Sequence, residues 1–253
     1  MLENVTKAKL AAGEPVYGCF VRYAEPAFTE FAAMQGWDFL IFDGEHGTLQ
    51  PRDVEGLCRA AELRGVTPIA RVTTNQPHII LRFMDTGVHG VHVPWVNTPA
   101  GVEEAVQSVK YQPRGQRGLA GSRASDWGTY ESIGEYTQRA NRETMVVIHI
   151  ETMEAVSAIE EYVAIDGVDV LFIGPTDLSH SLGHPGEPSH PKVASAMDRV
   201  ADVVVASDKT LGIFAGTPAA AGQWLDRGAR YFATGTDGFI KTGMQAYLAQ
   251  VRN

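Results

Sequence analysis

The sequence has 253 residues, of which 44% are hydrophobic and 20% charged, which suits a folded single domain with a full core and excludes a disordered chain. Thirty acidic residues against 21 basic ones give a net charge of -9, which argues against nucleic acid or an anionic membrane surface as a partner. Two cysteines without a CxxC pair, no run of 18 apolar residues and no signal-peptide pattern lead us to expect a cytoplasmic protein that spans no membrane.

Eight short apolar segments, each bounded by turn residues, are expected to form strands. They cover residues 16–21, 37–43, 67–72, 87–94, 145–150, 168–174, 211–216 and 230–235. Segments with helical periodicity lie between them, and two of these end in glycine, at Gly65 and Gly228. Apolar strands that alternate with helices are typical of a covered parallel sheet. Eight such units predict an α/β fold, a closed (β/α)8 TIM barrel that occupies residues 1–253 as one domain.

One segment interrupts this alternation. Residues 111–142 are rich in glycine and arginine and separate a helix from the fifth strand by more than a usual loop. Long loops without their own structure are uncommon in compact domains and are usually functional or disordered. We therefore expect this segment to be a lid or a subunit contact.

Polar residues follow the carboxyl ends of the predicted strands, where the active sites of such barrels form. In chain order they are Asp43, Glu45, His46, Arg71, His149, Glu151, Gly174, Thr176, Asp177, Thr236 and Asp237. The other six histidines are expected to be ordinary solvated or hydrogen-bonded side chains. They are His78, His89, His92, His180, His184 and His190.

Glu151 and Asp177 follow consecutive strands, and neighbouring parallel strands lie about 4.8 Å apart, so their carboxylates can meet on one ion. Two oxygen ligands from the protein are typical of Mg²⁺ or Mn²⁺, which keep several waters and accept substrate oxygens. The alternative for each acid taken alone is a helix N-cap or first-turn carboxylate.

Arg71 ends an apolar strand, where a guanidinium needs an anionic partner because it cannot lose its charge. That partner is either Asp43 or Glu45, in a structural ion pair, or an oxygen of the substrate. His46 is a candidate general acid or base, because histidine is the side chain most often used for proton transfer in catalysis.

Together these stretches resemble the HpcH/HpaI aldolases, a family of metal-dependent class II pyruvate aldolases. The matching segments are "DFLIFDGEHG", "PIARV", "GVHVPWVNT", "YQPRGQRG", "IETMEAV", "GVDVLFIGPTDLSHSLG", "LGIFAG" and "GARYFATGTD". The resemblance runs from about residue 16 to 240, with the segments in the family's order, which makes it highly specific.

The resemblance implies a divalent ion (Mg²⁺, Mn²⁺ or Co²⁺) held by Glu151 and Asp177, with pyruvate chelated to it. It also implies that the backbone around Thr176 and Asp177, next to Gly174, holds the pyruvate carboxylate. Arg71 would bind the keto oxygen and stabilise the enolate. The substrates would be a small 2-oxoacid and an aldehyde, and the last helix would be exchanged between subunits of a hexamer.

For proton transfer the resemblance implies His46, with Asp43 beside it and Asp85 as a further partner. The chain departs from the family at two positions of the site. His149 stands where the family usually has glutamine, and is either a nitrogen ligand or, as we favour, a donor to metal-bound water. Phe214 stands where leucine is common, near the methyl group of pyruvate.

The activity implied is cleavage or formation of 4-hydroxy-2-oxoacids, with pyruvate or hydroxypyruvate as the donor. A lysine Schiff base is disfavoured independently, because no lysine lies within an apolar strand segment. The alternatives are a barrel isomerase or epimerase acting on a phosphorylated or acidic sugar, and a metabolite-binding barrel without catalysis.

Overall fold

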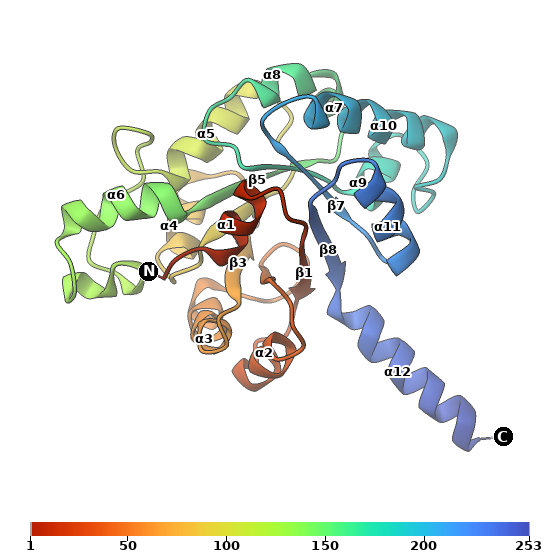
Figure 1. Ribbon diagram of the computed structural model, residues 1–253, viewed down its shortest axis with the longest axis horizontal. Helices are drawn as coiled ribbons and strands as arrows, with labels where there is room; N and C mark the ends of the chain where they lie inside the picture. The colour runs from red at the N-terminus through yellow and green to blue at the C-terminus, as the bar shows by residue number, and fades with distance from the viewer. Residues whose placement is uncertain (1, 253) are drawn as a thin grey trace.

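A closed barrel of eight parallel strands, paired in chain order, forms the centre of the computed structural model, which describes residues 2–252 (Figure 1). The strands are β1 (Val16–Val21), β2 (Phe39–Asp43), β3 (Thr67–Arg71), β4 (Gly90–Val93), β5 (Met145–Ile150), β6 (Val170–Ile173), β7 (Thr210–Phe214) and β8 (Tyr231–Gly235). All eight expected strands are present, with small differences at their ends. The predicted (β/α)8 barrel is confirmed.

Helices surround the barrel, and most of those that follow a strand begin at a proline. They are α1 (Val5–Ala11), α2 (Pro26–Ala33), α3 (Pro51–Glu62), α4 (Pro77–Met84), α5 (Pro99–Val109), α6 (Ile133–Glu143), α7 (Met153–Ser157), α8 (Ile159–Val163), α9 (Pro175–Ser181), α10 (Pro191–Val205), α11 (Pro218–Asp226) and α12 (Thr236–Val251). Proline suits the first helical position because its missing N–H would lack an intrahelical partner there. Within residues 2–252, none of these helices is long and apolar enough to cross a membrane.

The strands separate two apolar cores. Along β2, Phe39 and Ile41 point into the barrel, whereas Leu40 and Phe42 point outward to the helices. This alternation is the period of two expected of strand side chains. Both faces of each strand are therefore buried, which explains why the strand segments are apolar along most of their length.

The segment 111–142 is not a structureless loop. It contains a short 3₁₀ segment, η1 (Arg123–Gly128), and α6, whose N-terminus is a capping box of Ser132 and Glu135. Arg123 binds the carboxylate of Glu62 at the end of α3. It also donates a hydrogen bond of 2.8 Å to the carbonyl oxygen of Thr86, just after α4. These contacts lie at the amino ends of the strands, so the segment does not cover the carboxyl end of its own barrel. The lid expectation is wrong within one chain, and the subunit contact stays a prediction.

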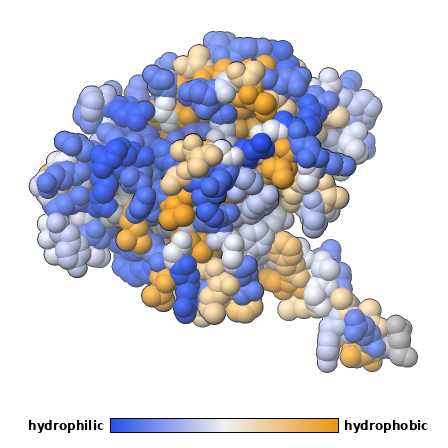
Figure 2. All heavy atoms as spheres, viewed as in Figure 1, coloured by the Kyte–Doolittle hydropathy of each residue, from blue (hydrophilic) through white to orange (hydrophobic). Residues whose placement is uncertain are grey.

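The last helix, α12, extends away from the barrel (Figure 1). Of its residues only Thr236, at its start, is buried. Large apolar side chains further along remain exposed: Phe239, Met244, Tyr247, Leu248 and Val251. Figure 2 shows hydrophobic surface along this helix.

Candidate active site

A cavity of about 200 Å³ opens at the carboxyl end of the strands. Its lining comes from β1, β3, β5, β6, β7 and β8 and from the segments that follow these strands and β2, which is the place where barrel enzymes build their active sites. The lining residues are Phe20, Arg22, His46, Arg71, His149, Glu151, Phe172, Gly174, Pro175, Thr176, Asp177, Phe214, Gly235 and Asp237. The two proposed metal ligands, Glu151 and Asp177, are thus brought to one cavity with Arg71 and His46.

Arg71 is held beneath this cavity by two acidic side chains. Asp43 lies directly beside it in the register of β2 and β3, and accepts from Nε at 2.8 Å and from Nη2 at 2.6 Å. Nη1 of Arg71 is 3.1 Å from Oε2 of Glu45. The guanidinium also lies over the ring of Phe20, at 4.6 Å from its centroid. Arg71 therefore pairs with both of the acidic residues considered from the sequence, and because it also lines the cavity, its role toward a substrate stays a prediction.

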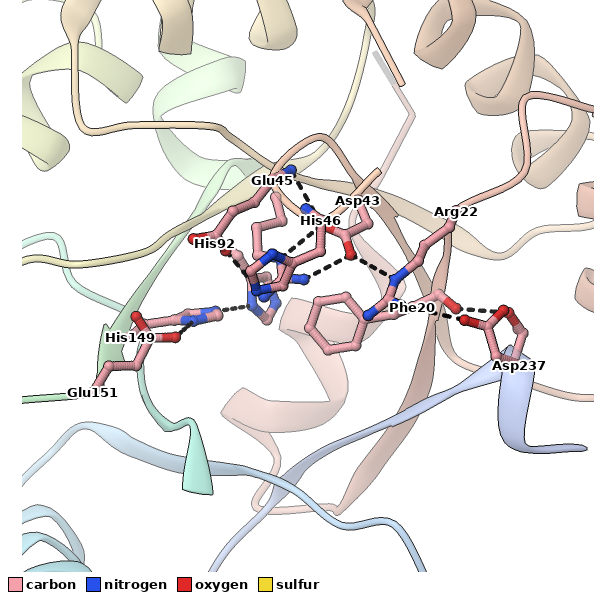
Figure 3. A network of polar contacts seen from close by, with 11 residues as sticks. Phe20, Arg22, Asp43, Glu45, His46, His92, His149, Glu151 and Asp237 are labelled. Carbon is pink, nitrogen blue, oxygen red and sulfur yellow. Dashed lines mark hydrogen bonds and ion pairs between the residues drawn. The ribbon is translucent and has the colours of Figure 1, made fainter. Parts of the chain in front are cut away.

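Asp43 is fully buried and acts as the hub of this network (Figure 3). Besides Arg71 it accepts the backbone N–H groups of Glu45 and His46, at 3.2 and 3.1 Å, and Nε of Arg22 at 3.1 Å. Burial alone would raise its pKa, but the hydrogen bonds and charge of Arg71 and the other donors outweigh burial and lower the pKa of Asp43. Asp43 therefore stays ionised and fixes both Arg71 and the loop that carries His46.

The pKa of Glu45 is shifted in the opposite direction to that of Asp43. Burial raises its pKa to about 7, against the attraction of Arg71 and with help from the negative charge of Glu151. The position of Glu45 after a buried strand was visible in the sequence, but its partial burial was not. Its contact with Arg71 was among the ion pairs expected from the sequence, whereas its raised pKa was not expected.

Glu151 is 2% exposed, and both of its carboxylate oxygens have partners. Nδ1 of His149 lies 2.6 Å from Oε1 (Figure 3), and the backbone N–H of Trp95 donates to Oε2 at 3.0 Å. Trp95 adopts φ 53°, a strained conformation for a bulky residue, which is the kind of strain found at functional sites. Burial works against ionisation of Glu151, but the partners His149 and Trp95, together with the charge of Arg71, lower its pKa.

His149 has both ring nitrogens engaged. Nδ1 contacts Glu151, and Nε2 lies 2.8 Å from Nδ1 of His92. In this arrangement neither nitrogen is left to ligate an ion or to donate to metal-bound water, which were the two roles expected from the sequence. His92 was expected to be an ordinary hydrogen-bonded histidine, and its location inside the barrel could have been suspected from the alternation of "VHV" on β4.

Gly174 leaves room for the Glu151 carboxylate. A Cβ atom at this position would lie 3.0 Å from both Cγ and Oε1 of Glu151, closer than such contacts normally are. Thr176 and Asp177 follow in the first turn of α9, and Phe214 closes the cavity from β7. The absence of a Cβ atom at Gly174 therefore leaves room for the Glu151 carboxylate at the edge of the cavity.

Two placements differ from the sequence expectation. Asp85 caps the end of α4, where it accepts from Nη2 of Arg117 at 2.7 Å, and it does not line the cavity. Within residues 2–252 no contact joins Asp85 to His46. Arg22 was missed, although it directly follows the first apolar strand; it binds Asp43 and also lies 3.3 Å from Asp237.

The fold and this cavity define a class of protein: a (β/α)8-barrel enzyme with a site of carboxylates, an arginine and histidines at the carboxyl end of its strands. The model of the HpcH/HpaI aldolase/citrate lyase family matches residues 16–242. The chain belongs to this family, and it is a carbon–carbon lyase.

The relatives agree with this placement. The 5-keto-4-deoxy-D-glucarate aldolase of Escherichia coli O6:H1 is 36% identical over 247 residues, which are 96% of this chain and 94% of that protein. The structure of an HpcH/HpaI aldolase/citrate lyase family protein from Burkholderia cenocepacia J2315 has 33% identity and a TM-score of 0.93, and the match covers 99% of this chain and 100% of the other. The citrate lyase beta subunit of M. tuberculosis, solved with oxaloacetate and magnesium, shares the fold at 15% identity, with a TM-score of 0.57 over 89% of this chain and 93% of that one.

Proposed function

We propose that the enzyme catalyses reversible, metal-dependent aldol cleavage of 4-hydroxy-2-oxoacids, which yields pyruvate or hydroxypyruvate and an aldehyde. The observation that carries the proposal is the meeting of Glu151, Asp177 and Arg71 at one cavity. The substrate named for the Escherichia coli relative has this chemistry, because its keto group lies next to a carboxylate, followed by a methylene and a hydroxylated carbon. A sugar-derived diacid is therefore the first substrate to test.

The residues present fit a divalent ion. Glu151 and Asp177 supply two carboxylates, and Gly174 keeps the space beside Glu151 open. No cluster of three or more histidine, cysteine, aspartate or glutamate side chains with metal-site geometry occurs among the described residues. Two protein carboxylates suit Mg²⁺, Mn²⁺ or Co²⁺ completed by water and substrate oxygens. The chemistry that such an ion supplies when bound is Lewis-acid polarisation of the keto oxygen.

We assign stabilisation of the enolate to Arg71. Its orientation is set in advance by Asp43 and Glu45, so it needs no rearrangement when negative charge develops on the keto oxygen. In the cleavage direction the proton of the C4 hydroxyl leaves, the C3–C4 bond breaks, and its electron pair passes to the enolate. We assign the C4 hydroxyl proton to His46, which lines the cavity. The enolate is then protonated at C3.

A Schiff-base mechanism would need a lysine at the cavity, and none lines it. Lys110 is the lysine whose properties come closest, since burial lowers its pKa to about 7. Its Nζ, however, donates to the carbonyl oxygens of Asn141 and Thr144 and to the Thr144 hydroxyl, away from the cavity. Borohydride with pyruvate should therefore leave the activity intact.

The test is exchange of the pyruvate methyl protons with deuterated water, followed by proton NMR. We expect exchange with Mg²⁺, Mn²⁺ or Co²⁺, none after EDTA treatment, and recovery when the ion returns. Glu151→Gln and Asp177→Asn should abolish exchange, whereas Asp198→Asn, a substitution at a half-exposed residue of α10, should not. Exchange that persists in EDTA would refute the proposal. A positive result leads to a screen for cleavage of 4-hydroxy-2-oxoacids, starting with 5-keto-4-deoxy-D-glucarate.

We further propose that α12 is exchanged between subunits of a hexamer. An apolar groove beside β8 and α11 is lined by Tyr17, Trp37, Leu225 and Phe232, while most of α12 extends away from it. A partner's α12 would cover such a groove with its exposed apolar residues. Light scattering on the full chain and on a chain that ends before α12 tests this, since the truncated chain should lose the assembly.

Cys19 and Cys58 are buried free thiols, which suits the expected cytoplasmic location.

A further inference from the structure

A chain of hydrogen-bonding side chains runs through the apolar interior of the barrel and ends at Glu151. The hydroxyl of Tyr231 on β8 lies 2.8 Å from Nε2 of His92 on β4. Nδ1 of His92 lies 2.8 Å from Nε2 of His149 on β5, and Nδ1 of His149 lies 2.6 Å from Oε1 of Glu151. Figure 3 shows the part of this chain from His92 to Glu151.

The surroundings of this chain are apolar. Tyr231 and His92 are fully buried, and His149 is 1% exposed. The rings of Phe20 and Phe172 pack against His92, with centroids 5.8 and 5.1 Å away. Each polar atom must therefore find its partner within the chain, because an unsatisfied buried donor or acceptor costs about 1–3 kcal/mol.

Tyr231 determines which atom donates and which accepts in each hydrogen bond of this series. Among residues 2–252, His92 is the hydrogen-bond partner of its hydroxyl, and burial raises the pKa of Tyr231 so far that the proton stays on the oxygen. The hydroxyl must donate to Nε2 of His92, which then acts as an acceptor. The opposite direction would leave the Tyr231 proton without an acceptor among phenylalanine rings.

The remaining bonds follow from this one. With Nε2 of His92 as an acceptor, its proton is on Nδ1 and is donated to Nε2 of His149. Burial, with the charges of His149 and Arg71, lowers the pKa of His92 well below its ordinary value, which agrees with a neutral ring. His149 then carries its proton on Nδ1 and donates it to Oε1 of Glu151.

We propose that Tyr231, His92 and His149 are positioning residues that hold the Glu151 carboxylate in one orientation for a divalent ion. The hydrogen-bonded side chains supply one donor, His149, to Oε1 of Glu151, and the backbone N–H of Trp95 supplies one to Oε2. A carboxylate has about four acceptor positions, so each oxygen keeps one for the ion. The inference rests on the proposed function, and it predicts that a tyrosine with no contact to Glu151 controls affinity for the ion.

The experiment uses Tyr231→Phe with Tyr136→Phe as the matched control. Tyr136 is also fully buried, but it lies outside the barrel with Tyr111, in the cluster packed beneath α6. Manganese affinity, measured by calorimetry without substrate, should fall about 10- to 100-fold in Tyr231→Phe, the usual effect of losing an outer-shell partner. It should stay at the wild-type value in Tyr136→Phe.

A second pair of variants and a spectroscopic measurement complete the test. His92→Leu removes the donor to His149 and should weaken manganese binding, whereas His92→Asn keeps an amide N–H near the position of Nδ1 and should retain most of it. Nitrogen-15 NMR of the metal-free protein should show the proton of His149 on Nδ1. A proton on Nε2, or wild-type manganese affinity in both Tyr231→Phe and His92→Leu, would overturn the proposal.

These readouts separate this proposal from the proposed function. The tautomer of His149 and the manganese affinity are both measured without substrate. An enzyme that binds manganese as described but does not cleave 4-hydroxy-2-oxoacids would refute the proposed function. It would still support the proposed role of the hydrogen-bonded residues Tyr231, His92 and His149.

Discussion

The substitution Asp43→Asn tests whether the buried pair between Asp43 and Arg71 holds the site together. The amide keeps the shape of the side chain, but it has no charge and only one oxygen. Asp43 now accepts two charged hydrogen bonds from Arg71, at 2.8 and 2.6 Å, and the amide can accept only one of them. Arg71 is 6% exposed, so its charge would remain buried with only Glu45 as a partner. Removing one member of a buried pair costs about 3–5 kcal/mol.

For a chain of this size 1 kcal/mol shifts the melting temperature by roughly 2–4 °C, so we expect Asp43→Asn to lower it by roughly 6–20 °C at pH 7. The control is Asp198→Asn, which removes a half-exposed pair with Arg227 and should cost about 0–1 kcal/mol. Thermal unfolding followed by circular dichroism gives both values, with all samples at one protein concentration because the stability of an oligomer depends on concentration.

The pH dependence of this difference has a definite sign. The folded-state pKa of Asp43 is below its unfolded value, so its contribution to stability is present above the unfolded pKa of about 3.9 and is lost as the pH falls through the folded value. The gap between wild type and Asp43→Asn should therefore narrow in acid. Equal melting temperatures for Asp43→Asn and Asp198→Asn at pH 7 would refute the reasoning.

Three further predictions concern the cavity. Glu45→Gln should raise the free energy of unfolding at pH 8 by up to about 3 kcal/mol and leave it unchanged near pH 4. The reason is that the folded-state pKa of Glu45, about 7, lies above its unfolded-state pKa, so the stability of the wild type falls as the pH rises between these two values. Denaturant titrations at both pH values measure the difference. Gly174→Ala should weaken manganese binding in calorimetry, whereas Gly235→Ala, where a Cβ meets open space, should not; equal affinities would contradict the role given to Gly174. Phe214→Leu should enlarge the donor pocket and raise the ratio of hydroxypyruvate to pyruvate exchange by about tenfold, and an unchanged ratio would show that Phe214 does not contact the donor.

Much of the site could be predicted because it follows directly from strand ends. Parallel strands of a barrel deliver their carboxyl ends to one rim, so Glu151, Asp177 and Arg71 had to gather once the eight strands were recognised. The pairing of Asp43 with Arg71 follows in the same way, since both end neighbouring strands at the same level of the register.

The sequence by itself thus determined the barrel, the end of the barrel that carries the chemistry and the residue types at that end, because these depend on local periodicity and chain order. Only the tertiary structure decided the meeting of His92 with Tyr231, 139 residues away, as well as the raised pKa of Glu45 and the location of Asp85 beside Arg117. The physical reason is that these features depend on which side chains share the closed interior or one end of the barrel. Such neighbourhoods arise from packing between distant strands and helices, and no local pattern in the chain encodes them.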